Sequence, residues 1–379
     1  MIIQMSKYCI AINALIMDNK KAGIGNYAFN LLQEMLKFPS DFIIDIYIQD
    51  HMSSQFNSTE NMHFIKCPNF ESSRDRILYE QLKLPHLYRQ YDYSLIHFMD
   101  YMSPILPIKS KKVVTIHDLS YFIYPEYFTI GSRYMKQFLT GPSIRSADRV
   151  ICVSYNTKND IQKRYKLSDK LRVIHLGVEP IEKTVNKDKG REILKKYGIN
   201  GSFIMYTGTL EPRKNVETLI SAYHSAVKEG NIIQDLVLCG KPGWKYEGIY
   251  NEIKNSGLSE RIILTGYVPS DDLSIIFDNA DVFVYPSLYE GFGLPPLEAM
   301  AHGVPVICSN SSSLPEVVGE AALTFSPEDK EALTALMIKL LEDTNLRSEL
   351  VEKGYNRASL FTWENTVNKT YKVYEELLN

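Results

Sequence analysis

Short apolar runs rich in β-branched residues alternate with amphipathic segments along nearly the whole chain, and this alternation constrains the fold more than any other feature. The runs occupy residues 9–15, 42–48, 94–98, 113–117, 150–154 and 172–175 in the first half, and 203–207, 236–239, 262–265, 282–285, 306–308 and 322–325 in the second. Segments with helical periodicity, such as 27–36 and 216–227, lie between them. Strand, helix and strand in this order predict an α/β protein with parallel sheets and right-handed crossovers.

The chain has 379 residues, which is more than one hydrophobic core usually serves, so we expect two doubly wound domains. Residues 177–189 are polar, contain Gly and Pro and lack a sustained periodicity, which indicates a linker. We therefore assign residues 1–180 to an N-terminal domain and residues 190–360 to a C-terminal domain. Residues 361–379 hold an amphipathic helix that need not pack on its own domain and is able to pack back on the first one.

Composition and charge narrow the class of protein. Hydrophobic residues make up 45% and charged residues 23%, as in an ordinary globular protein. The apolar stretches are shorter than the ~20 residues of a membrane span, and the first 17 residues do not resemble a secretory signal, so we expect a cytoplasmic protein. The net charge of −3 gives no reason to expect a nucleic-acid partner.

The two halves of the chain differ in charge. Residues 1–185 hold 23 basic and 18 acidic residues, a balance of +5, and the remainder has a balance of −8. A basic first half would be attracted to an anionic membrane, which would place the protein peripherally at the inner face of that membrane. An uneven distribution that arose by chance explains the same numbers equally well.

A loop with two carboxylates follows the run 282–285. It reads Glu290-Gly-Phe-Gly-Leu-Pro-Pro-Leu-Glu298, in which the glycines let the backbone bend closely round a ligand and the prolines fit a first helical turn. The amides at such a turn form an anion site that suits a diphosphate. Glu290 is placed to accept hydrogen bonds from sugar hydroxyls, and Glu298 from a ribose diol. The alternative for Glu298 is an acidic residue that only stabilises its own helix start.

Two further loops follow predicted strands. Arg213 and Lys214 come after the run 203–207, where their charges can neutralise a leaving diphosphate; two solvated loop charges are the alternative. Gly23 and Gly25 come after the first run and before a helix expected near Asn26, which is the placement of a loop that approaches a phosphate. That loop lacks the third glycine of a dinucleotide fingerprint, so we reject an NAD-binding interpretation.

His117 ends the run 113–117, at the carboxyl edge of a predicted sheet. A histidine there can donate to a transferred sugar or hold one of its hydroxyls, and the alternative is a core residue. His97 also ends a run and is a candidate to border an acceptor site. The chain has no Asp-x-Asp triplet and no His/Cys/Asp cluster with metal-ligand spacing, so we predict no metal and no cofactor.

The carboxylate loop resembles the signature of the retaining glycosyltransferases of family 4. The two glutamates, with seven residues between them, lie within Glu-Gly-Phe-Gly-Leu-Pro-Pro-Leu-Glu-Ala-Met-Ala-His-Gly-Val-Pro-Val. Other segments resemble the family in its usual order over roughly residues 8 to 320, namely Gly23–Tyr27, Ile116–Leu119, Val153-Ser154, Val173–Gly177 and Tyr206–Asn215.

The resemblance implies the fold called GT-B, in which two facing Rossmann-like domains border an interdomain cleft. It implies that the first domain binds the acceptor and the second the nucleotide sugar. Lys214 and Arg213 would then hold the departing diphosphate together with the backbone amides around Phe292–Leu294. His117 would lie in the active site. The remaining donor contacts that the resemblance implies are the loop of Gly23 and Gly25 over the diphosphate, the backbone near Val268 on the base, the amides of Phe292, Gly293 and Leu294, and Glu298 on the ribose.

The family retains anomeric configuration, and its leaving phosphate takes the acceptor's proton, which agrees with the lack of an evident general base. We favour transfer of mannose from GDP-mannose to a glycan or lipid-linked oligosaccharide, because the chain resembles mannosyltransferases of bacterial surface polysaccharides. UDP-glucose, UDP-galactose and UDP-N-acetylglucosamine fit the same motifs. Two other classes remain open: a nucleotide-sugar 2-epimerase, which needs no acceptor, and a binding protein without turnover.

Overall fold

The computed structural model describes residues 8–18, 23–38, 40–179, 181, 187–229 and 232–379. The chain divides into two compact units. Unit 1 comprises the chain up to Ile123, Ile130–Gly177 and Trp363–Asn379, and unit 2 comprises Tyr124–Thr129 and Val178–Thr362. In the described part of the chain, no helix has the length and apolar character needed to cross a membrane.

Unit 1 is built on a seven-stranded parallel sheet with the order β3-β2-β1-β4-β5-β6-β7. The strands are β1 (Cys9–Asn13), β2 (Ile43–Gln49), β3 (Met62–Cys67), β4 (Leu95–Phe98), β5 (Lys111–Ile116), β6 (Arg149–Cys152) and β7 (Leu171–Val173). The apolar runs predicted every strand of this sheet except β3. That strand lies at the sheet edge and is only partly buried, so its sequence mixes polar with apolar residues.

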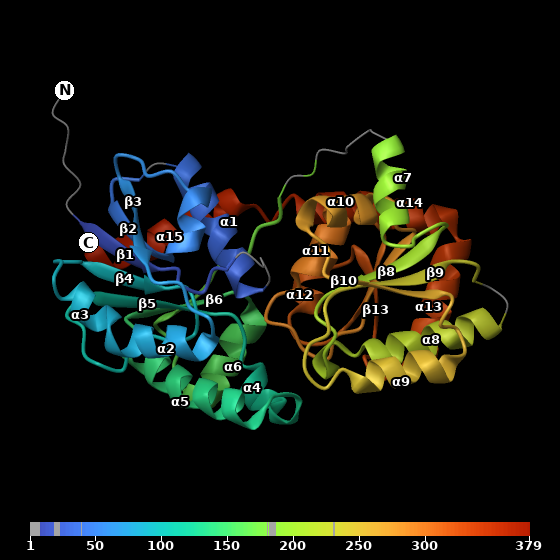
Figure 1. Ribbon diagram of the computed structural model, residues 1–379, viewed down its shortest axis with the longest axis horizontal. Coiled ribbons are helices and arrows are strands. Elements are labelled where there is room, and N and C mark those ends of the chain that lie inside the picture. Colours follow the sequence, from blue (N-terminus) through green and yellow to red (C-terminus); the bar gives the residue numbers. More distant parts are fainter. Residues whose placement is uncertain (1–7, 19–22, 39, 180, 182–186, 230–231) are drawn as a thin grey trace. The chain divides into compact units, whose positions relative to one another are not determined.

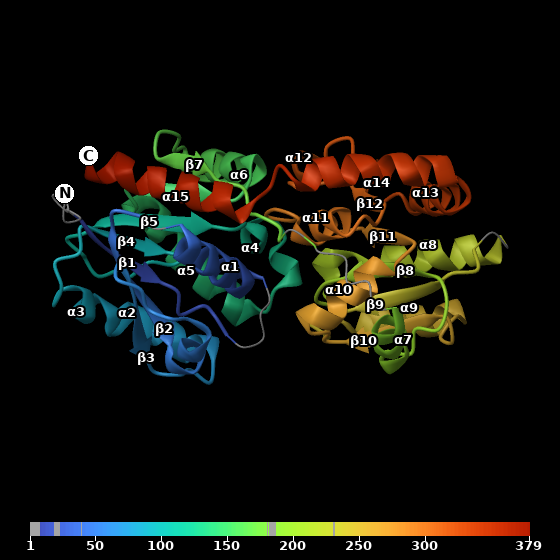
Figure 2. The same cartoon turned by 90° about the horizontal axis from the view of Figure 1, so that it is seen from above.

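Helices cover both faces of this sheet, as the doubly wound prediction requires. Helices α1 and α15 pack side by side on one face, and α2, α5 and α6 lie on the other (Figures 1 and 2). Helix α1 begins at Ile24 rather than near Asn26, because Gly23 in a left-handed conformation (φ 53°) closes the preceding loop. The helical segments are α1 (Ile24–Lys37), η1 (Asp50–Gln55), α2 (Ser73–Leu82), α3 (Leu84–Tyr88), α4 (Ser120–Ile123), α5 (Ile130–Ser146), α6 (Tyr155–Tyr165) and α15 (Trp363–Leu378).

The C-terminal helix α15 belongs to unit 1, although it follows the whole of unit 2 in the sequence. Its Tyr374 hydroxyl lies 2.7 Å from His97 Nδ1 in the core. Its Glu376 carboxylate pairs with Arg149 at 3.1 Å and with Arg172 at 2.8 Å. A buried hydrogen bond and two ion pairs therefore fasten the end of the chain to the sheet of unit 1.

Unit 2 contains a six-stranded parallel sheet with the order β10-β9-β8-β11-β12-β13. The strands are β8 (Phe203–Thr207), β9 (Asp235–Cys239), β10 (Ile262–Gly266), β11 (Val282–Tyr285), β12 (Val306–Ser309) and β13 (Ala322–Phe325). Every residue of the central strands β8 and β11 is buried, since helices cover both faces. Helices α8, α9 and α13 lie on one face, and α10, α11, α12 and α14 on the other (Figure 1).

The helical segments of unit 2 are η2 (Pro125–Tyr127), α7 (Lys187–Lys196), η3 (Pro212–Lys214), α8 (Val216–Lys228), α9 (Glu247–Ser256), α10 (Ser270–Asp278), α11 (Leu294–Ala301), α12 (Leu314–Val318), α13 (Lys330–Glu342) and α14 (Thr344–Ala358). The predicted linker 177–189 overlaps the start of α7, and its residues 180 and 182–186 lie outside the described chain.

One short segment departs from the expected domain boundaries. Tyr124–Thr129 comes from the region assigned to the first domain but belongs to unit 2. The Trp244 indole donates a hydrogen bond to the Tyr127 carbonyl, and Lys245 Nζ donates to the Glu126 carbonyl at 2.6 Å. The Phe128 ring lies 5.7 Å from that of Trp244. These contacts bind the segment to the loop after β9, so a boundary at residue 180 alone does not describe the structure.

Candidate active site

In open parallel sheets, ligands bind where neighbouring strands send their connections in opposite directions. In unit 2 this point lies between β8 and β11, and in unit 1 between β1 and β4. Most predicted site residues of unit 2 follow β8 and β11, and Val268 follows β10, while the glycine loop of unit 1 follows β1. Each unit therefore offers its own candidate half-site, described in turn below.

The Glu290 carboxylate is the centre of the half-site in unit 2. Its Oε1 accepts hydrogen bonds from Lys214 Nζ at 2.7 Å, from the Tyr285 hydroxyl at 2.9 Å and from the Ser287 hydroxyl at 2.5 Å. Its Oε2 lies 3.3 Å from the Arg213 guanidinium. Burial opposes ionisation of Glu290, but the charges of Lys214 and Arg213 outweigh it and hold the pKa at about 2. Glu290 is therefore a permanent anion at neutral pH and cannot act as an acid there.

The two cations beside Glu290 are held by the same network. Lys214 Nζ also donates to the Tyr285 hydroxyl at 2.7 Å, so two of its three N–H groups have partners. Arg213 donates to Glu211 at 2.7 Å. Both cation side chains are almost buried, with exposures of 12% and 13%. They are not the solvated loop charges of the alternative interpretation.

Backbone contacts join the loops after β8 and β11. The Leu288 amide donates to the Arg213 carbonyl at 2.9 Å. Asn215, in a left-handed conformation at the start of α8, donates its side-chain amide to the carbonyls of Pro286 at 3.1 Å and Pro327 at 2.7 Å. Asn215 thereby ties together the loops after β8, β11 and β13. This explains how residues 76 positions apart, such as Lys214 and Glu290, are kept in register.

A serine-rich loop after β12 forms hydrogen bonds with the backbone of the carboxylate loop. The sequence analysis did not predict this role for the serines. Ser312 Oγ accepts from the Glu290 amide at 2.7 Å. Ser313 Oγ donates to the carbonyls of Glu290 at 3.0 Å and Phe292 at 2.5 Å. The available signal was a polar run, residues 309–313, directly after a predicted strand at the edge where the other site residues lie. These serines position the loop rather than face a ligand.

The start of α11 has the features of an anion site, in a modified form. Gly293 has φ 125°, and a Cβ there would approach Leu314 Cδ2 to 2.8 Å, so glycine is required. The two prolines of the first turn carry no amide hydrogen, which leaves fewer donors than a standard helix start. Within the described residues, the amides of Gly293 and Leu294 have no recorded acceptor. The Phe292 side chain is an anchor, with its ring 5.8 Å from that of Phe361.

Glu298 lies on α11 and differs from Glu290 in its hydrogen-bond partners and in its pKa. No hydrogen bond or ion pair of its carboxylate is recorded within the described residues. Burial raises its pKa to about 7, although its surface is only partly covered. Its oxygen atoms are therefore available to accept bonds from a ligand, and it lies in the fifth position of the helix rather than in the first turn. This favours the binding role over stabilisation of the helix start.

Val268 follows β10, which lies two strands from β8 in the sheet order. Its side chain is 7% exposed, whereas the neighbouring Tyr267 is 48% exposed. It shares the carboxyl edge of the sheet with the Glu290 cluster.

The half-site in unit 1 is built round a buried histidine. His117, directly after β5, is 9% exposed and donates its Nε2–H to the Met99 carbonyl at 2.9 Å. Burial lowers its pKa, so the ring is neutral near pH 7. With Nε2 as the donor, the neutral ring presents Nδ1 as an acceptor. This geometry favours holding a hydroxyl over donating a proton to it.

The glycine loop and His117 are brought together through Tyr27. The Tyr27 ring, in the first turns of α1, meets the His117 ring edge-on with centroids 4.8 Å apart. Gly25 lies in the first turn of α1, where a Cβ would be in ordinary contact with the Ile16 carbonyl oxygen, at 3.4 Å.

His97 does not border a site, contrary to the expectation. Its side chain is fully buried in the core of unit 1. Nε2 lies 2.8 Å from Thr115 Oγ1 and Nδ1 lies 2.7 Å from the Tyr374 hydroxyl, so both nitrogens have partners. Burial lowers its pKa to about 3. The residue links β4, β5 and α15 and is structural.

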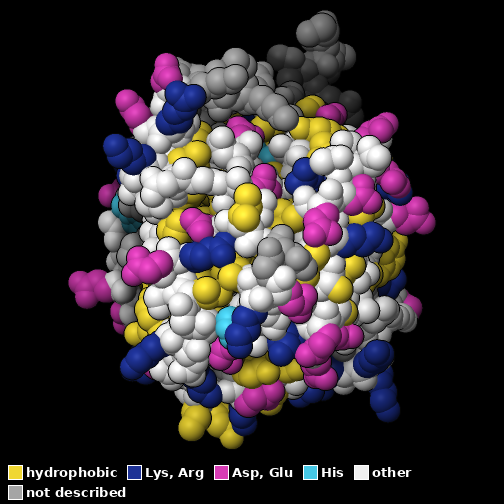
Figure 3. Space-filling view, turned by 90° about the vertical axis from the view of Figure 1, so that its right-hand side faces the viewer, with side chains coloured by type: hydrophobic (Ala, Val, Ile, Leu, Met, Phe, Trp, Pro, Cys, Tyr) yellow, Lys and Arg dark blue, Asp and Glu magenta, His cyan; other side chains and the backbone are white. Residues whose placement is uncertain are grey.

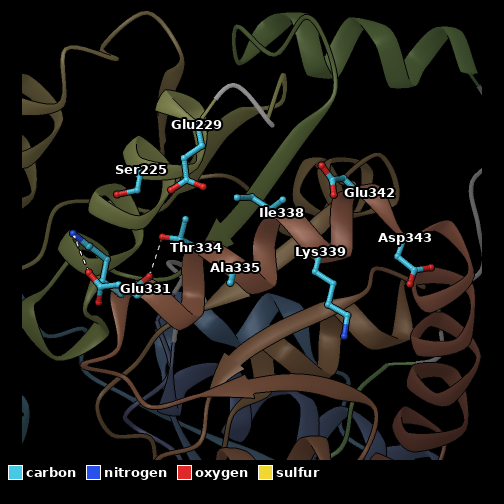
Figure 4. Close-up of a pocket in the computed structure, with 10 residues that line it drawn as sticks. Ser225, Glu229, Glu331, Thr334, Ala335, Ile338, Lys339, Glu342 and Asp343 are labelled. Atoms are coloured by element: carbon cyan, nitrogen blue, oxygen red, sulfur yellow. Dashed lines mark hydrogen bonds and ion pairs between the residues drawn. The ribbon is translucent and has the colours of Figure 1, made fainter.

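Unit 2 also has a groove of about 720 Å³ between α8 and α13, away from the Glu290 cluster. Figure 4 shows its lining, with Ser225 and Glu229 on α8 and Thr334, Ile338 and Lys339 on α13. Lys330 pairs with its neighbour Glu331, and Thr334 donates to the Lys330 carbonyl. No predicted site residue lines the groove. Within the described residues, no group of three or more His, Cys, Asp or Glu side chains could hold a metal ion.

Two family models match the chain, one in each half. Residues 22–181 match the family model of Glycosyltransferase Family 4, and residues 189–357 match that of Glycosyl transferases group 1. The chain is 32% identical over 368 residues to O-antigen chain mannosyltransferase B of Escherichia coli, covering 94% of this chain and 96% of that protein. The chain belongs to glycosyltransferase family 4. This transferase is also 31% identical over 276 residues to serotype-specific mannosyltransferase WbdA of Escherichia coli, and it spans about a third of that longer protein.

The fold of the transferase matches that of solved structures. Sucrose-phosphate synthase from Thermosynechococcus elongatus superposes with a TM-score of 0.77 and 22% identity, over 98% of this chain and 99% of that one. The transferase therefore has the GT-B fold of two Rossmann-like domains, as the sequence predicted. The Glu290 cluster is in the group 1 part of the chain, and His117 and the glycine loop are in the family 4 part.

Proposed function

We propose that the protein transfers a hexose, with retention of anomeric configuration, from a nucleotide sugar to a glycan or lipid-linked oligosaccharide in polysaccharide biosynthesis. The favoured donor is GDP-mannose. Similarity to O-antigen chain mannosyltransferase B over nearly the whole of both chains supports mannose as the sugar. The observation that carries the chemistry is the buried Glu290 carboxylate, which holds Lys214 and Arg213 at the carboxyl edge of β8 and β11.

The donor contacts in this proposal use the groups that remain open in unit 2. The third N–H of Lys214 donates to a phosphate oxygen, together with the amides of Gly293 and Leu294. Glu298 accepts from the two ribose hydroxyls, which no protein group contests. Glu290 Oε2, with one long contact to Arg213, accepts from a hydroxyl of the transferred sugar. The backbone near Val268 contacts the base.

In the reaction, the bond between the anomeric carbon and the β-phosphate oxygen breaks, and the acceptor hydroxyl oxygen bonds to that carbon on the same face. The bonding pair leaves with the diphosphate, and the acceptor's proton passes to the departing phosphate oxygen. Lys214 and Arg213 stabilise the charge that grows on the diphosphate. No protein base is needed, which agrees with an ionised Glu290 whose basicity is very low.

The contribution of unit 1 is proposed from its neutral groups. His117 accepts a hydroxyl of the transferred sugar through Nδ1, and the backbone at Gly23 and Gly25 approaches the diphosphate. This requires both units to act on one donor during turnover. Unit 1 also takes the acceptor, and a lipid-linked acceptor places the enzyme peripherally at the inner face of an anionic membrane.

The test is hydrolysis of GDP-mannose, UDP-glucose, UDP-galactose and UDP-N-acetylglucosamine by the purified protein, without acceptor and with EDTA present. Slow release of GDP alone supports the proposed donor and a reaction without metal. Release of UDP from one sugar would replace GDP-mannose by that donor. Formation of an isomerised sugar would support a 2-epimerase, and no release with no thermal shift by GDP or UDP would leave only a binding protein.

A further inference from the structure

Helix α5 carries a stripe of large apolar side chains on its outer surface. Ile130, Tyr134 and Phe138 are 74%, 58% and 68% exposed. They are spaced four residues apart, so they lie on one side of the helix. Scattered exposed apolar residues are ordinary, but three large ones aligned along one side of a helix indicate a surface that binds a partner.

The same region concentrates positive charge. Residues 130–166, from α5 to the end of α6, hold eight basic and two acidic side chains, a balance of +6. Residues 1–185 together have a balance of only +5, so this segment accounts for the entire basic excess of the first half. Figure 3 shows a contrasting face of unit 2, where acidic and basic side chains are interspersed. The basic residues of the segment are Arg133, Lys136, Arg145, Arg149, Lys158, Lys163, Arg164 and Lys166.

A groove of about 830 Å³ joins the apolar stripe to part of this charge. It lies among α4, α5 and α6, with Phe122 and Phe138 in its apolar lining and Arg145, Lys163 and Arg164 as its basic groups. Asp160 is the acidic side chain in the lining, and it accepts from the Asn156 amide at 3.1 Å. The Arg164 guanidinium lies 3.6 Å from the centroid of the Phe122 ring, so the charge sits directly on the apolar surface.

We propose that this surface docks on an anionic lipid bilayer. We call it the α5–α6 face and define it by Ile130, Tyr134, Phe138, Arg145, Lys163 and Arg164. The apolar side chains enter the interfacial zone of the bilayer, and the basic side chains pair with lipid phosphates. The charge selects a bilayer over a second copy of the chain, since two copies joined through this face would bring Arg145, Lys163 and Arg164 of one copy against those of the other.

The inference deepens the proposed function, on which its biological sense rests, because a lipid-linked acceptor would be presented at such a surface. Binding itself needs no donor or acceptor. The test is sedimentation of the full chain with vesicles rich in phosphatidylglycerol and, separately, with phosphatidylcholine vesicles. We expect binding to the anionic vesicles only, and release at high salt.

Two variants locate the surface. The triple variant Arg145→Gln, Lys163→Gln, Arg164→Gln should lower the vesicle partition coefficient about 100-fold, at about fivefold per charge. Phe138→Gln should lower it about tenfold. The matched controls lie on unit 2: Ile233→Gln, at a side chain that is 83% exposed, and Lys254→Gln, and neither should change binding.

The outcomes separate this inference from the proposed function. Unchanged vesicle binding by both α5–α6 variants, or equal binding to both vesicle types, overturns the docking surface. A dimer in light scattering that Phe138→Gln dissociates also overturns it and assigns the stripe to a second copy. Donor hydrolysis and thermal midpoint of the variants should match the wild type, so loss of vesicle binding with intact hydrolysis reports on the surface alone. Absent hydrolysis with intact vesicle binding would refute the transferase proposal and leave the docking surface standing.

Discussion

The two sheets share one topology at their carboxyl edges but hold their buried charges differently there. In unit 2, the loops after β8 and β11 bury two cations against a carboxylate whose Oε1 accepts three hydrogen bonds. In unit 1, the corresponding edge carries a neutral histidine that is bonded to a carbonyl, and its buried charges, Arg76, Glu80 and Asp100, pair with one another. The comparison teaches that strand order provides a place for a ligand, whereas the loops decide which ligand.

The largest expected effect tests the charged edge. Glu290→Gln should lower kcat/KM by about 10²–10³-fold, equivalent to roughly 3–4 kcal/mol, because it removes a fixed anion that orders Lys214 and Arg213. Steady-state kinetics with the donor identified by hydrolysis measure it. The matched control is Glu320→Gln at an exposed site of unit 2. Full activity of Glu290→Gln would show that the cluster is structural.

The second prediction contrasts the two buried histidines of unit 1. His117→Asn should reduce kcat about 10–100-fold with little change in thermal midpoint, since the Nδ1 acceptor that it loses has no protein donor among the described residues. His97→Leu should instead lower the free energy of unfolding by about 1–3 kcal/mol, because Thr115 and Tyr374 lose their buried partner. Activity assays and denaturant unfolding on both variants distinguish the roles. A large stability loss in His117→Asn would place His117 with His97 in the core.

The third prediction uses the different pKa values of the two glutamates. Burial raises the pKa of Glu298 to about 7, and ribose hydroxyls bond to its ionised form, so affinity for GDP should fall as the pH drops below 7. If only the ionised form of Glu298 binds, the affinity for GDP at pH 6 is about tenfold lower than when Glu298 is fully ionised. Glu290, with a pKa of about 2, contributes nothing in this range. Calorimetric titration between about pH 6 and 8 measures the slope, and Glu298→Gln should abolish it; an unchanged slope would assign it elsewhere.

The smallest expected effect concerns the loop behind the site. Ser313→Ala removes bonds to the carbonyls of Glu290 and Phe292, each worth about 0.5–1.5 kcal/mol, so turnover should fall about fivefold. Ser348→Ala, on the exposed side of α14, is the control and should leave turnover unchanged. Equal effects of both substitutions would exclude a positioning role for Ser313.

The sequence was most informative where burial is complete. The bounds of β8 and β11 match their apolar runs, and the loops after them hold the residues that were predicted to carry charge. Strand β3 was missed because this edge strand buries only part of its side chains and mixes polar with apolar residues. Ser312 and Ser313 were missed because their function depends on contacts with a loop more than 20 positions away. The local sequence pattern does not show which distant residues a side chain contacts.

The path of the chain between the units has a practical consequence for exchanging specificity. Residues 124–129 belong to unit 2 through Trp244 and Lys245, and residues 363–379 belong to unit 1 through His97 and Arg149. In a chimera joined at the linker alone, each unit would therefore contain one segment from the wrong parent. Grafting a new donor specificity should transfer residues 124–129 together with 178–362 and leave α15 with the recipient. The natural module of exchange is discontinuous in sequence, and recombination at a single point cannot deliver it intact.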